Sequence, residues 1–194
     1  MGKKNTSRQN PYIGKAGHLA VMAEFALLGY NVALPEIDKG DDIYVVNDAS
    51  GKLWRVQVKS ATVQRIRGEG FQVRILESQI TTAPVNGAPD LHFVFALRQI
   101  ERWRFIVMSR STLKNYIDEK ESQGKPFGHL DDTGRRALGL TFQHNNPNEI
   151  LCSATSWTQH LSSWEQEWPY LDHAVPPVGE CALEENEWPR TITM

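Results

Sequence analysis

The chain has few cysteines, no long apolar run and no strong excess of charge of either sign. Its two cysteines, Cys152 and Cys181, lack the spacing of metal ligands, which argues against a disulfide framework or a zinc site and indicates reduced thiols. No apolar run approaches the ~20 residues that span a bilayer, so we expect no membrane partner. Polar residues follow Met1, so we expect no signal peptide and a cytoplasmic location.

Charge is distributed unevenly along the chain. The formal net charge is only -2, yet residues 1–74 hold 11 Lys and Arg against 7 Asp and Glu, while residues 75–194 hold 10 against 16. A basic half of this kind suits a face that binds a polyanion such as nucleic acid. The 194 residues and an apolar fraction of 40% suffice for one domain with an ordinary core.

The hydropathy pattern indicates an α/β or α+β domain with a mixed central sheet, and we expect the α/β class with helices flanking the sheet. Residues 13–28 have helical spacing, and Gly29 fits the left-handed position that ends a helix. A second helix is expected at residues 111–121, with Ser111 as its N-cap. Strands are expected at residues 30–34, 43–46, 53–59, 71–76, 91–97 and 104–108.

Beyond residue 123 the pattern weakens. Residues 124–139 are rich in glycine and charge and are expected to form a mobile loop. Residues 153–168 carry Trp157, Trp164 and Trp168 at helical spacing, which predicts a helix in a C-terminal helical or irregular extension. We expect its rings to pack on the core or across a dimer interface, with stacking on bases as the alternative.

These patterns predict an organisation in four parts. Residues 1–12 form a flexible N-terminus, 13–122 the folded domain, 123–172 the Trp-containing extension, and 173–194 an acidic, poorly ordered tail.

The most informative motif joins Asp42 to a strand carrying Gln57 and Lys59. Side chains alternate along a strand, so Trp54, Val56 and Val58 point into a core while Gln57 and Lys59 share the other face with Arg55. An Asp carboxylate and a Gln carbonyl can bind a hard divalent cation, and a lysine can stabilise charge on a phosphate. Each residue alone fits a turn or a solvated strand face, but the joint spacing favours phosphodiester hydrolysis.

Further residues could contribute to this site. His18 lies on the first predicted helix, on the side of Val21 and Phe25. It is either a buried histidine with its hydrogen bonds satisfied or an auxiliary catalytic residue. Glu24, six residues on, does not share its face. The candidate phosphate contacts, which a solvated face would explain equally well, are Arg55, Ser60, Arg65, Arg67 and Arg74.

Four stretches together resemble the PD-(D/E)XK, or restriction endonuclease-like, nuclease superfamily. Residues 14–32 resemble its opening helix and first strand, residues 40–43 and 56–59 its catalytic core, and residues 90–95 a following Asp-led strand. The Gln-Val-Lys form is similar to the branch that includes group I intron homing endonucleases and related bacterial proteins of unknown role. The likeness extends over about residues 12–110.

The resemblance implies a restriction endonuclease-like fold and Mg²⁺- or Mn²⁺-dependent cleavage of DNA. Asp42 and Gln57 would hold the metal, Lys59 would assist the attacking water, and a homodimer would cut both strands. Members of this branch commonly place Glu where this chain has His18. A catalytically degenerate nucleic-acid-binding module is therefore the second interpretation, and a protein–protein adaptor built on the Trp segment is the third.

Overall fold

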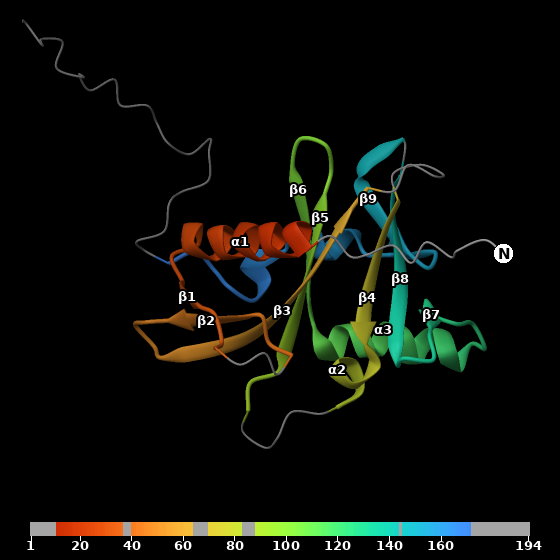
Figure 1. Ribbon diagram of the computed structural model, residues 1–194, viewed down its shortest axis with the longest axis horizontal. Coiled ribbons are helices and arrows are strands. Elements are labelled where there is room, and N and C mark those ends of the chain that lie inside the picture. Colours follow the sequence, from red (N-terminus) through yellow and green to blue (C-terminus); the bar gives the residue numbers. More distant parts are fainter. Residues whose placement is uncertain (1–10, 37–39, 64–69, 83–87, 144, 172–194) are drawn as a thin grey trace, which may run out of the picture.

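A computed structural model describes residues 11–36, 40–63, 70–82, 88–143 and 145–171 (Figure 1). Its first sheet is mixed and has the strand order β1-β2-β3-β5-β6, in which β3 and β5 run parallel and the other neighbours antiparallel. These strands are β1(Asn31–Ala33), β2(Ile43–Asn47), β3(Lys52–Thr62), β5(Leu91–Arg98) and β6(Trp103–Ser109). The predicted α/β class with a mixed central sheet is confirmed.

A second, antiparallel sheet stands beside the first (Figure 1). Its order is β10-β9-β8-β4, and β7 pairs with β8. The strands are β4(Gly70–Leu76), β7(His129–Leu130), β8(Arg135–Gln143), β9(Asn146–Cys152) and β10(Thr155–Ser156). The expectation of a loop over residues 124–139 is therefore wrong in part, because alternate residues from Arg136 to Phe142 are buried in β8.

Three α-helices accompany the sheets in the described part of the chain. They are α1(Pro11–Leu27), the short α2(Glu77–Thr81) and α3(Arg110–Ser122). Gly29 follows α1 with φ 91°, as predicted for the residue that ends a helix. The N-cap of α3 is Ser109 rather than Ser111, since the Ser109 side chain accepts a hydrogen bond from Thr112 N.

Two apolar clusters cover opposite faces of the first sheet. On one face, Val21 and Phe25 of α1 pack with Val56 and Val58 of β3. On the other face, Phe93 and Phe95 of β5 pack with side chains of the second sheet and of α3. The predicted alternation of β3 is confirmed, because Trp54, Val56 and Val58 all belong to the first cluster.

Residues 153–168 do not form the predicted helix, and the segment from Trp157 to Leu171 is largely irregular. It contains two short 3₁₀ turns, η1(Thr158–His160) and η2(Trp164–Gln166). Between them the chain crosses the outer edge of β6, where Ser162 N donates to Phe105 O at 2.8 Å. Trp157 is therefore buried in one apolar cluster, while Trp164 and Trp168 are buried in the other.

This segment completes the cover of α1. The Trp168 ring lies 4.9 Å from the Phe25 ring and 6.2 Å from the Trp54 ring, measured between centroids. Leu171 N donates to Leu28 O at 3.1 Å, and the Tyr30 hydroxyl donates to Pro169 O at 2.9 Å. Packing of the rings on the core is confirmed, and their burial leaves no open face for stacking on bases.

Two expectations from composition also have outcomes. Cys152 is fully buried, as a structural thiol should be, whereas Cys181 lies outside the described residues. No helix in the described ranges is long and apolar enough to cross a membrane.

Candidate functional site

The structure brings Asp42, Gln57 and His18 together where β2 begins. Asp42 N donates to Val56 O at 2.9 Å, which pairs this residue with β3 just before the strand β2 starts. The Asp42 Oδ2 atom accepts from Val58 N at 2.7 Å and from the Gln57 side-chain amide. His18 Nε2 reaches the same oxygen at 3.5 Å from α1. The carboxylate is thus held by β3 on one side and faces α1 on the other.

The neighbouring Asp41 has a different role. Its carboxylate accepts two hydrogen bonds from the Arg55 guanidinium, at 2.8 and 3.0 Å, and one from the Tyr44 hydroxyl at 3.3 Å. Asp41 is 6% exposed, and its hydrogen bonds raise the pKa of Arg55. Arg55, predicted to contact phosphate, therefore carries a buried carboxylate partner within the protein.

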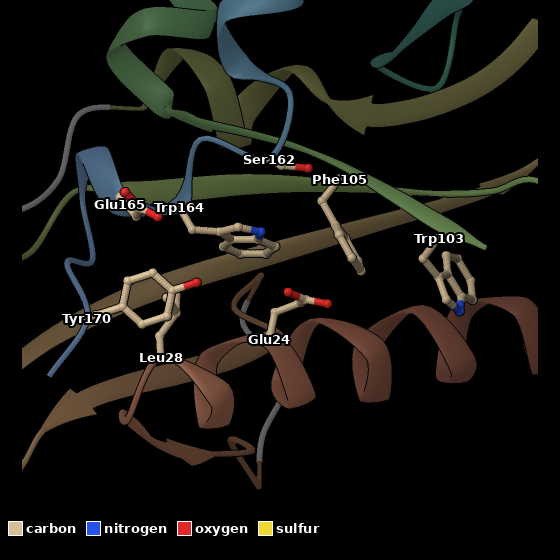
Figure 2. A pocket seen from close by; sticks show the side chains of 8 residues that line it. All are labelled: Glu24, Leu28, Trp103, Phe105, Ser162, Trp164, Glu165 and Tyr170. Atoms are coloured by element: carbon tan, nitrogen blue, oxygen red, sulfur yellow. The ribbon is translucent and has the colours of Figure 1, made fainter. Parts of the chain in front are cut away.

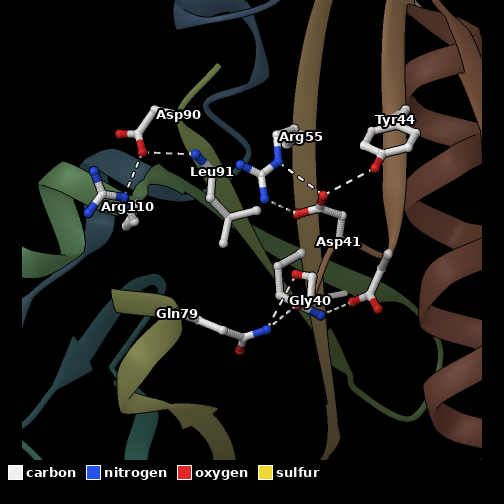
Figure 3. Close-up of polar contacts among 10 residues, drawn as sticks. Gly40, Asp41, Tyr44, Arg55, Gln79, Asp90, Leu91 and Arg110 are labelled. Carbon is white, nitrogen blue, oxygen red and sulfur yellow. Dashed lines mark hydrogen bonds and ion pairs between the residues drawn. The ribbon is translucent and has the colours of Figure 1, made fainter. Parts of the chain in front are cut away.

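Gln79 of α2 joins the site, although the sequence analysis did not select it. Its Nε2 donates to Gln57 Oε1 at 2.5 Å and to Gly40 O at 3.3 Å. Figure 3 shows this amide beneath the loop that carries Gly40 and Asp41. A five-residue helix is too short for its periodicity to be recognised, so no pattern in the sequence marked Gln79.

Lys59 and Ser60 lie on opposite faces of β3. Lys59 is two residues beyond Gln57 on the same face, and its side chain is partly buried. Ser60 faces α1, where a Cβ placed on Gly17 would lie 1.9 Å from the Ser60 Oγ. That hydroxyl is buried without a hydrogen-bond partner, so the structure does not bring it to the face of Gln57 and Lys59.

Of the remaining candidate phosphate contacts, the structure describes only Arg74. Arg74 is exposed on β4, in the second sheet. Arg65 and Arg67 lie outside the described residues.

A second ion pair stands near the first (Figure 3). Asp90 Oδ1 accepts from Arg110 Nε at 2.7 Å and from Leu91 N at 2.9 Å, and Arg110 also donates to Ile80 O at 3.3 Å. This pair ties the start of β5 to α2 and α3. Together with the Asp41–Arg55 pair it braces the elements that hold Gln57 and Gln79.

Glu24 belongs to another part of the molecule, as its position on α1 predicted. It lines a cavity of about 330 Å³ together with Trp103, Phe105 and Trp164 (Figure 2). Burial raises the pKa of its carboxyl. Glu24 therefore belongs to this cavity and not to the group around Asp42.

The donor set around Asp42 suits a hard divalent cation held with help from a substrate. Such ions bind oxygen ligands, and Asp42 and Gln57 offer a carboxylate and an amide carbonyl. Gln79 Oε1 is buried and has no partner in the structure. The described residues contain no group of three or more His, Cys, Asp or Glu placed to hold a metal.

Comparisons with known proteins assign no family. No family model and no curated protein matches the chain. A solved structure of a bacterial homing endonuclease, I-Ssp6803I, is similar over 54% of this chain and 67% of that one, with 21% sequence identity and a TM-score of 0.41. A similarity of this extent does not place the chain in a family.

Proposed function

We propose that the chain is a metal-dependent endonuclease that hydrolyses phosphodiester bonds in DNA. One observation carries the proposal: two donors from β3, the Gln57 side-chain amide and Val58 N, converge on the same oxygen of Asp42. The strand β3 also carries Lys59. The resemblance of residues 40–43 and 56–59 to the PD-(D/E)XK catalytic core supports the same function. We further propose a cytoplasmic homodimer, since cutting both strands with one site per chain takes two chains.

Each residue has a part in the proposed reaction. Asp42 and Gln57 would hold Mg²⁺ or Mn²⁺, which would supply a Lewis acid for the phosphate and the attacking water. Lys59 donates to a phosphate oxygen and stabilises the charge that grows there as water attacks. His18, 3.5 Å from Asp42 Oδ2, orients that carboxylate or a nearby water by hydrogen bonding.

Plasmid cleavage by a Lys59→Ala variant tests the proposal. Supercoiled plasmid is incubated with Mg²⁺, Mn²⁺ or EDTA, and nicked and linear products are measured. Removing one donor to the developing charge should lower the rate by about 10²–10³-fold. Lys52→Ala, at the exposed start of the same strand, is the matched control and should cleave at the wild-type rate. Cleavage by Lys59→Ala at that rate would refute the assigned site.

A binding module without catalysis is the second candidate, and His18 in place of Glu favours it. This candidate predicts DNA affinity that falls steeply with salt and no metal-dependent product. Fluorescence anisotropy with labelled duplex DNA measures the affinity. If the wild-type protein binds without cutting, cleavage by a His18→Glu variant would identify the missing carboxylate as the cause.

A further inference from the structure

We propose that Gln79 is a positioning residue that sets which end of the Gln57 side-chain amide faces Asp42. The inference rests on the function proposed above and extends it to a residue that does not itself touch the metal or the substrate. Its consequence is that Gln79 controls how readily the Asp42 site accepts a divalent cation.

The three side chains form a hydrogen-bonded chain with a defined direction. The Asp42 carboxylate can only accept, so Gln57 must present its Nε2 to it. The Gln57 Oε1 then faces away from Asp42 and accepts from Gln79 Nε2 at 2.5 Å. In this arrangement the carbonyl that should bind a metal is directed at Gln79.

The surroundings of Gln79 are built to hold an amide in this place. A Cβ on Gly40 would lie 3.0 Å from Gln79 Nε2, so the absence of a side chain there makes room for the amide. Gly40 also has φ +99°, a conformation that side chains rarely adopt. The other end of the amide, Oε1, is buried and has no partner. An acceptor is therefore already present beside Gln57 but is turned away from it.

A half-turn of both amides converts the site to a form that binds a cation. Gln57 then directs Oε1 to the side of Asp42, and its Nε2 donates to the Oε1 of Gln79. Gln79 gives up its hydrogen bond to Gly40 O in this form, so the bound cation must also offset that loss. Amide nitrogen and oxygen are nearly equal in size, so neither β3 nor α2 needs to move. Without a cation, two oxygens side by side repel each other, which explains the direction seen in the structure. Gln79 can serve both states because an amide both donates and accepts.

Mn²⁺ binding to the full chain without DNA tests the inference, with free Mn²⁺ followed by electron paramagnetic resonance into the millimolar range. Gln79→Ala removes the acceptor that the cation-binding form needs, and should weaken binding by about 10-fold or more, as loss of a supporting hydrogen bond around a metal does. Gln79→Glu introduces a side chain that only accepts, which forces Gln57 Nε2 toward it and should tighten binding by about 10-fold.

Ser78 supplies the matched controls, because it is exposed on the same short helix. Ser78→Ala should leave Mn²⁺ affinity unchanged, and Ser78→Glu, which adds the same charge one residue away, should change it by less than about threefold because exposed charges are screened. Thermal unfolding by circular dichroism establishes that every variant is folded. Equal tightening by Gln79→Glu and Ser78→Glu would reduce the effect to charge and overturn the inference.

The outcomes separate this inference from the function on which it rests. If the wild-type protein binds Mn²⁺ and Gln79→Ala binds it equally well, the positioning role is wrong and the metal site stands. If the wild-type protein binds no Mn²⁺ and all variants behave alike, the proposed metal-dependent function is wrong and the inference falls with it. If both variants of Gln79 shift the affinity in opposite directions, the inference is supported.

Discussion

Two glycines of α1, Gly14 and Gly17, should respond in opposite ways to the same substitution. A Cβ at Gly17 would lie 1.9 Å from Ser60 Oγ, 2.8 Å from Ser60 Cβ and 3.3 Å from Ala96 Cβ. Rotation of the Ser60 hydroxyl relieves the first contact but not the second, so α1 must move away from β3. A Cβ at Gly14 would meet nothing within 4 Å.

The magnitude follows from two opposing effects. Replacing glycine by alanine inside a helix stabilises it by about 0.5–1 kcal/mol, and both variants gain this amount. Forcing extra atoms into a packed contact costs about 1–3 kcal/mol, and Gly17→Ala alone incurs this cost. The free energy of unfolding should therefore be about 1–3 kcal/mol lower for Gly17→Ala than for Gly14→Ala.

Urea unfolding followed by tryptophan fluorescence measures the difference, with midpoints and slopes fitted for both variants. If Gly17→Ala proves as stable as Gly14→Ala, the close approach of α1 to β3 is wrong. The same displacement should carry His18 away from Asp42. Mn²⁺ affinity measured on the folded Gly17→Ala protein therefore checks whether the helix position matters to the site.

Two buried titratable groups give further predictions. Burial lowers the pKa of His92, which packs against Trp168, so the unfolded chain takes up this proton at a higher pH than the folded one. The stability contributed by neutral His92 should be fully present above about pH 6.5 and should fall as the pH drops below that value. Between pH 8 and pH 5 the urea midpoint should therefore decline less for His92→Gln than for the wild-type protein. Burial also raises the pKa of the Cys152 thiol to about 12. In a Cys181→Ser background, a thiol reagent at pH 8 should leave the folded protein unmodified and react fully in denaturant; rapid reaction of the folded protein would contradict the buried position.

Much of the first sheet could be predicted, because its strands have clear local signals. The alternation of Val56 and Val58 with Gln57 and Lys59 is visible in the sequence, and it places the motif on one face whatever the tertiary structure. In the second sheet, β4 agrees with the strand predicted at residues 71–76, but β8 was not predicted, because it follows a stretch rich in glycine and charge. Leu138, Leu140 and Phe142 nevertheless alternate within it. The helical spacing of the tryptophans led to a wrong prediction for a different reason. Side chains buried on the two faces of a sheet can have the same spacing in the sequence as side chains buried on one face of a helix.

The part of the candidate site that lies within one sequence motif could be predicted. Asp42 and Gln57 meet because β2 and β3 pair directly, and His18 joins them because α1 packs on β3. Gln79 comes from α2, which follows β4 of the second sheet, and nothing local marks it. The alternation that directs Val56 and Val58 into the core also places Ser60 on their face, so the assignment of Ser60 to the phosphate contacts is wrong.

The position of the Trp157–Leu171 segment over α1 has a consequence for synthesis. During translation the ribosome releases α1 long before Trp164 and Trp168, which cover Phe25 and Trp54. Until then the apolar side of α1 can pack against only some of its partners. A nascent chain in that state exposes apolar surface, which chaperones and proteases recognise. The helix α1 is therefore synthesised first, but the side chains that complete its packing are synthesised last. Folding of this half of the protein should wait until the last described residues have left the ribosome.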